Sequence, residues 1–115
     1  MPTIKVSLNT SANPPVTVDQ QTLEVSSGLQ TIIWEPASGQ TFTFPSNALS
    51  GLPDPPFSQP QVNGNGVSVS DNNGASYRNL YAYTLTVTSN GQNYSTARRP
   101  DPTQQSAPGP FIRNK

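Results

Sequence analysis

The clearest signal in the sequence is an alternation of apolar and polar positions over residues 79–96, NLYAYTLTVTSNGQNYST. The larger side chains and the smaller, mostly hydroxyl side chains take turns: Tyr81, Tyr83, Leu85 and Val87 alternate with Ala82, Thr84, Thr86 and Thr88. This two-residue period is typical of a strand with one buried face. The Asn90-Gly91 pair that follows tolerates positive φ at both centres of a type I′ turn, so the sequence predicts a two-strand hairpin here.

Comparable short runs occur along the rest of the chain, between clusters of turn residues. They cover residues 4–8, 16–18, 22–25, 30–35, 41–44 and 67–69. The run through Ile32, Ile33 and Trp34 is apolar on both faces, which is typical of a central strand. About seven or eight short strands without a helical period predict an all-β fold, an antiparallel two-sheet sandwich of immunoglobulin-like or related Greek-key type. A small closed barrel is the alternative architecture.

Proline is concentrated in two parts of the chain and suggests how the domain is organised. The stretch LPDPPFSQP, residues 52–60, predicts an ordered crossing loop, because prolines remove ladder donors and favour extended backbone. The second concentration lies near the C-terminus. At 115 residues the chain has the length of one domain. We expect residues 1–100 to form the sandwich and residues 101–115 a Pro-rich tail, in which Phe111 and Ile112 dock or add an edge strand.

Composition excludes several function classes. Six basic and six acidic residues leave no net charge, and only 10% of residues are charged, so no field of one sign exists to attract nucleic acid. Cysteine and histidine are both absent. The chain therefore lacks disulfides, the usual zinc ligands and the commonest general base near neutral pH. We expect a protein that is not an enzyme and has no cofactor.

No segment of the sequence predicts insertion into a membrane. The N-terminal MPTIKVSLNT has no apolar core of the signal-peptide type, and no apolar run approaches the length of a transmembrane helix. The cytoplasm is the default expectation for its location. The cysteine-free composition equally suits an exported protein whose leader has been removed.

Several short motifs together resemble a known group of proteins. In chain order they are Ile33-Trp34, Phe42-Thr43-Phe44-Pro45, Phe57-Ser58-Gln59-Pro60, residues 81–87, Asp101-Pro102 and Ile112-Arg113-Asn114. This order resembles a group of small uncharacterised bacterial β-sandwich proteins of immunoglobulin-like type. In that group the closing motifs run together as Asp-Pro-x-Ile-x-Asn, whereas here TQQSAPGP separates them. The resemblance implies the sandwich fold and no particular activity.

Six side chains are candidates for contacts with a partner: Trp34, Tyr94, Arg98, Arg99, Phe111 and Ile112. Aromatic faces such as those of Trp34 and Tyr94 stack on sugars when they are exposed. The two arginines suit an acidic partner, although a solvated turn explains them equally well. The apolar pair near the C-terminus suits strand addition to a partner or to a second copy.

Two acidic motifs have both a chemical and a simpler structural interpretation. Glu35 beside Trp34 has the pairing expected of a glycosidase acid, but a core tryptophan followed by a solvent-facing acid is the simpler interpretation. Asp71-Asn72-Asn73-Gly74 places oxygen ligands ahead of a glycine, as calcium loops do. It lacks the spacing and the distal acid of an EF-hand, so we expect a turn.

Three functional hypotheses follow, in order of preference. The first is a non-enzymatic β-sandwich module for interaction with a protein partner or for self-assembly through strand edges or the C-terminal tail. The second is a carbohydrate-binding module that uses exposed aromatic side chains. The third is a hydrolase that uses two carboxylates.

Overall fold

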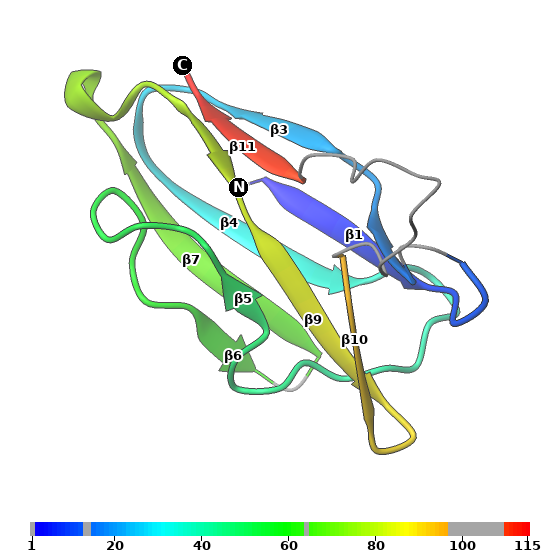
Figure 1. Ribbon diagram of the computed structural model, residues 1–115. Coiled ribbons are helices and arrows are strands. Elements are labelled where there is room, and N and C mark those ends of the chain that lie inside the picture. The colour runs from blue at the N-terminus through cyan, green and yellow to red at the C-terminus, as the bar shows by residue number, and fades with distance from the viewer. Residues whose placement is uncertain (1, 13–14, 64, 97–109) are drawn as a thin grey trace, which may run out of the picture.

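The computed structural model describes residues 2–12, 15–63, 65–96 and 110–115 (Figure 1). It confirms the prediction of an all-β chain, since the described residues form eleven strands and one short 3₁₀ helix. In chain order the elements are β1 (Thr3–Leu8), β2 (Val16–Val18), β3 (Thr22–Val25), β4 (Gly28–Pro36), β5 (Leu49–Ser50), β6 (Gln61–Asn63), β7 (Gly66–Asn73), η1 (Ala75–Tyr77), β8 (Leu80–Ala82), β9 (Thr84–Ser89), β10 (Gln92–Ser95) and β11 (Phe111–Asn114).

The largest sheet has five strands in the order β2-β1-β4-β7-β6. Strand β4 lies in its centre, as the apolar run around Trp34 predicts. It pairs with β7 over seven residues, from Gly28 opposite Asn73 to Trp34 opposite Val67. Strand β4 therefore has no free edge; Ile32 and Trp34 point into the core, and Ile33 on the opposite face is half-buried.

Two three-stranded sheets have the orders β10-β9-β5 and β3-β11-β8. Strands β8 and β9 follow each other along the chain with only Tyr83 between them. The Tyr83 N–H donates to the main-chain oxygen of Pro110 at 3.0 Å, just ahead of β11. The Thr96 N–H donates to the oxygen of Leu85 at 2.9 Å, just after β10. Strands β10 and β11 therefore follow the same side of the β8–β9 segment.

The sheets are mixed, which differs from the expectation of antiparallel pairing alone. Strand β1 runs parallel to β4, and β3 runs parallel to β11. The alternation of side chains sets which face of a strand is buried but carries no information on the direction of its neighbour. Only the hairpins, where a short turn joins two strands, have their direction fixed locally. Each of the two parallel pairs joins strands with other strands between them in the chain.

Two segments have a different secondary structure from the one predicted. Residues 41–44 make a single bridge, between Thr43 and Thr88, in place of a strand. Phe42 and Phe44 are nevertheless buried, and their rings meet edge to face at 5.6 Å. The predicted turn at residues 71–74 is mostly strand, because β7 continues to Asn73.

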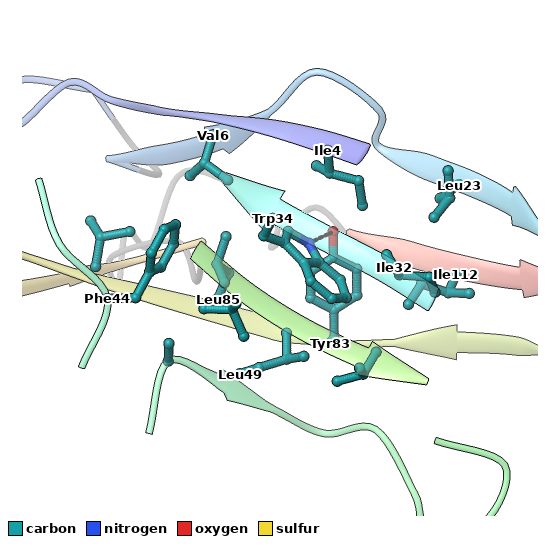
Figure 2. Close-up of a cluster of buried hydrophobic side chains, with 14 of the residues drawn as sticks. Ile4, Val6, Leu23, Ile32, Trp34, Phe44, Leu49, Tyr83, Leu85 and Ile112 are labelled. Atoms are coloured by element: carbon teal, nitrogen blue, oxygen red, sulfur yellow. Dashed lines mark hydrogen bonds between the residues drawn. The ribbon is translucent and has the colours of Figure 1, made fainter. Parts of the chain in front are cut away.

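The core is drawn from all three sheets (Figure 2). Its fully buried members with the largest side chains are Trp34, Phe57, Ile4, Ile32, Leu85 and Ile112. Tyr83 is buried against Trp34, as Figure 2 shows, so the side chains that the alternation placed on the apolar face of residues 81–87 do reach the core. Tyr81 is half-buried and meets Phe57 edge to face at 5.0 Å.

The predicted hairpin is confirmed at residues 84–95. Strands β9 and β10 pair from Gln92 opposite Ser89 to Ser95 opposite Thr86. Asn90 and Gly91 have φ of 52° and 75°, the two positive values that a type I′ turn requires. In Figure 1 this hairpin projects from the body of the molecule at the lower right.

Candidate functional site

Two of the six predicted contact residues have buried side chains. Trp34 and Ile112 both have no exposed surface. The Trp34 indole N–H donates to the Tyr83 hydroxyl at 3.1 Å. A sugar therefore cannot stack on Trp34, and among the aromatic residues of the carbohydrate hypothesis only half-buried tyrosines such as Tyr94 have accessible surface.

The segment around Phe111 is part of the sheet. Strand β11 lies between β3 and β8, with Phe111 opposite Thr22 on one side and Ala82 on the other. Phe111 donates its N–H to the oxygen of Gln21 at 2.8 Å. The apolar pair Phe111-Ile112 is thus engaged within its own chain. Arg98 and Arg99 lie outside the described residues.

Tyr94 lies on β10, which is the last strand of its sheet. Its side chain is half-buried, and its hydroxyl donates to Oε1 of Gln92 at 2.9 Å. In a hairpin, the main-chain N–H and C=O groups of successive residues point alternately toward the partner strand and away from it. Because a two-residue turn joins Ser89 and Gln92, and Thr96 bonds to Leu85, the main-chain groups of Asn93 point away from β9. Among the described strands, none pairs with this side of β10.

The other side of β9 is covered. Thr86 donates its N–H to the oxygen of Ala48 at 2.6 Å, and Thr88 and Thr43 exchange hydrogen bonds of 2.8 and 3.0 Å. At Gly51, next to β5, φ is 93°, and a side chain there would come within 3.2 Å of the Ala82 oxygen. The close approach of this loop to the β8–β9 segment leaves no room for an added strand.

Four of the five side-chain carboxylates in the described residues contact a cation or an N–H group. Glu35 forms an ion pair with Lys5, and Glu24 forms one with Lys115 at 2.8 Å. The hydrogen bond and charge of Lys115 lower the pKa of Glu24. Asp19 accepts the main-chain N–H of Lys5 at 3.0 Å. The lowered pKa of Glu24 is the opposite of the raised pKa that a glycosidase acid needs.

The fourth of these acids, Asp71, belongs to a buried polar cluster that the sequence analysis did not predict. We call Asp71, Asn73 and Asn114 the acceptor cluster; all three are buried. Asn114 donates from Nδ2 to Oδ1 of Asp71 at 3.0 Å. Asn73 donates from Nδ2 to the main-chain oxygens of Val25, Ser26 and Lys115 at 2.9, 3.0 and 3.3 Å. The cluster therefore connects β7 with β11 and with the end of β3.

The signal for this cluster was present in the alternation of β7. Val67, Val69, Asp71 and Asn73 occupy every second position, and all four are buried. Had the two-residue period been continued past Val69, it would have placed the two polar side chains inside. The Gly74 that follows favoured a turn instead.

Three oxygen atoms of the acceptor cluster are buried without a hydrogen-bond partner: Oδ2 of Asp71, Oδ1 of Asn73 and Oδ1 of Asn114. Burial raises the pKa of Asp71, and the hydrogen bond from Asn114 opposes part of that increase. No group of three or more histidine, cysteine or acidic side chains suited to a metal ion is found among the described residues.

The chain matches no protein-family model, and no curated protein matches it. Within the described ranges, none of the helical structure has the length and apolar character needed to cross a membrane.

Proposed function

We propose that this chain is a non-enzymatic interaction module with an immunoglobulin-like two-layer sandwich, and that it self-associates by adding a strand to β10 at Asn93. The observation that carries the proposal is that β10 is an uncharged edge strand whose Asn93 main-chain groups face outward.

The two-layer arrangement is supported by the connection between the small sheets. Tyr83 is the only residue between β8 and β9, and its N–H bonds to Pro110 beside β11. Strands β10 and β11 would then lie end to end along one side of a continuous β8–β9 strand, and the two three-stranded sheets would form a single layer. The five-stranded sheet would be the other layer, with Trp34 and Tyr83 in contact between them.

The chemistry of β10 suits strand addition. Its sequence Gln92-Asn93-Tyr94-Ser95 contains no charge and no proline, two of the features that natural edge strands use to prevent pairing, and at four residues it is longer than the uncharged edge strands β2 and β6. At the edge of β3, by contrast, Glu24 and Lys115 form an exposed ion pair beside the ladder. An added strand would gain main-chain hydrogen bonds at Asn93 and apolar contact with the exposed part of Tyr94.

A second copy of the chain is the partner that fits this edge. Two β10 strands paired antiparallel about Asn93 would form an interface with two-fold symmetry, in which each copy presents the same residues. The net charge of zero provides no general repulsion between copies. The edge itself carries no charge that would face its own copy across the axis.

The proposal is tested by substituting Asn93. Among the main-chain hydrogen-bonding groups, proline at this position removes the outward N–H and leaves those that face β9, because these belong to the neighbouring residues. The matched control is Asn93→Ala, which keeps this N–H but, like proline, removes the side-chain oxygen that accepts from Oγ1 of Thr88 at 2.7 Å. Sedimentation velocity from micromolar to millimolar concentration gives the mass of each protein.

We expect the wild-type chain and Asn93→Ala to dimerise and Asn93→Pro to remain monomeric. A wild-type chain that is monomeric throughout this range would contradict self-association. Equal dimerisation of Asn93→Pro and Asn93→Ala would place the interface away from β10.

A further inference from the structure

We propose that Asp71 is a proton-binding site, so that the folded chain holds a proton within the acceptor cluster and releases it as the pH rises. The inference does not depend on the proposed function. It rests on the arrangement of donors and acceptors between β7 and β11.

The acceptor cluster has more acceptors than donors. The Asn73 amide has two N–H bonds, and three main-chain oxygens surround its nitrogen. The Asn114 amide donates to Oδ1 of Asp71. After these bonds, one oxygen on each of the three side chains has no donor. A buried oxygen without a donor is costly, and an ionised one is costlier still.

A proton on Asp71 lowers both the cost of the buried charge and the cost of the buried oxygens that have no donor. It removes the buried negative charge, and it converts Oδ2 from an acceptor into a donor that is available to an amide oxygen of the cluster. Burial of the carboxyl group acts in the same direction by disfavouring its charged form. The hydrogen bond from Asn114 favours the ionised form but reaches only one of the two carboxyl oxygens.

A metal ion is a poorer occupant. Calcium takes about six to eight oxygen ligands, and the cluster offers three unpartnered oxygens with one carboxylate among them. All three side chains are buried, so water is not at hand to complete the coordination. A single proton requires neither additional oxygen ligands nor water.

No cation on the surrounding elements replaces the proton. On β11 and β3 the charged groups are Arg113, Lys115 and Glu24; all three are exposed, and the last two pair with each other. On β8 the titratable group is the half-buried phenol of Tyr81, and the loop before Phe57 carries the exposed Asp54. The half-buried Tyr77 lies on η1, which packs against β7, and Arg78 directly after it is exposed. The paired segment of β4 presents Gln30 opposite Asp71. The two described ion pairs both involve other acids.

The proton would help to hold the C-terminal strand. The cluster joins β7 to Asn114 of β11 and, through Asn73, to the main chain at Val25 and Lys115. Loss of the proton leaves a buried charge between these elements, which weakens the attachment of β11 first.

Carboxyl carbon chemical shifts in the intact wild-type protein test the proposal directly. We expect the midpoint of Asp71 in the folded chain to lie above that of the same carboxyl group in the urea-unfolded chain. A folded-state midpoint at or below the unfolded one would overturn the proposal, whatever else occupies the cluster.

Unfolding by urea as a function of pH provides the second readout. An acid whose folded-state pKa is raised stabilises the fold below its unfolded value of about 4, and this contribution is lost as the pH rises through the folded value. We expect this decline in the wild type and in the control Asp54→Asn, and its absence in Asp71→Asn, whose amide supplies N–H donors without a charge. Persistence of the decline in Asp71→Asn would assign it to another group. Stabilisation of the wild type, but not of Asp71→Asn, by calcium or sodium ions would overturn the proposal in favour of a cation. If Asp71→Asn does not fold, the titration decides.

Discussion

The indole N–H of Trp34 donates a hydrogen bond to the hydroxyl oxygen of Tyr83 at 3.1 Å, and their rings meet edge to face with centroids 5.4 Å apart. The bond connects the central strand of the five-stranded sheet to the junction between β8 and β9. Both side chains are buried, so neither polar group has water as an alternative partner. This pair therefore combines apolar burial with a polar contact between β4 and the β8–β9 junction.

Tyr83→Phe should destabilise the fold by about 1–3 kcal/mol, because it leaves the Trp34 N–H buried without an acceptor. Urea unfolding at neutral pH gives the change. The matched control is Tyr94→Phe, whose hydroxyl bonds to exposed Gln92 and should contribute less than about 0.5 kcal/mol. Equal losses of unfolding free energy in the two variants would show that the buried bond contributes no more to stability than the exposed one.

Alkaline conditions should weaken the fold through the same tyrosine. Burial raises the pKa of Tyr83 to about 12, although the hydrogen bond from Trp34 opposes the increase. The folded state then binds this proton more tightly than the unfolded state, so the stabilisation is complete below about pH 10 and is lost as the pH rises from about 10 towards about 12. Absorbance near the tyrosinate band, followed together with circular dichroism, should show Tyr83 ionising late. In Tyr83→Phe the loss of stability over this range should be smaller, with a remainder from Tyr81, whose pKa burial also raises. An unchanged loss would contradict the assignment.

Gly91→Ala should destabilise the hairpin by about 1 kcal/mol, because alanine is strained at the positive φ of 75° that this turn imposes. The control is Gly74→Ala, at a glycine with φ of −94° whose nearest neighbour to an added Cβ is a side-chain atom of Tyr77 at 3.9 Å. That change should be close to neutral. Thermal unfolding of both variants compares them, and a neutral Gly91→Ala would argue against the type I′ turn.

Leu85→Ala should cost about 2–5 kcal/mol, since Leu85 is fully buried and its truncation leaves a cavity. Leu29→Ala makes the same chemical change at a side chain that is 70% exposed, and it should change the free energy of unfolding by less than about 0.5 kcal/mol. Urea unfolding of the two variants side by side measures the difference. Similar losses would mean that Leu29 is covered in solution, for example by a second copy.

Local signals in the sequence predicted the parts of the fold that depend on local rules. The period of residues 81–87 placed Tyr83, Leu85 and Val87 in the core, and Asn90-Gly91 marked the turn. The apolar run at Trp34 marked a central strand. In each case the structure depends on the burial or the φ angle of single residues, and the residue type indicates both.

The pairing directions and the acceptor cluster depend on contacts between distant parts of the chain. Nothing in residues 22–25 indicates that they run parallel to residues 111–114. Asn114 acquires its role only when β11 is brought opposite Asp71, 43 positions away in the chain. The same pairing places Phe111 and Ile112 in a sheet of their own chain. The sequence alone was equally compatible with strand addition to a partner.

Hydrogen exchange at the Asn93 amide tests the central claim of self-association most directly, because this N–H faces away from β9. Two-dimensional NMR of samples at micromolar and millimolar concentration measures its rate. Self-association through β10 predicts strong protection at the high concentration and rapid exchange at the low one. The same rapid rate at both concentrations would contradict it.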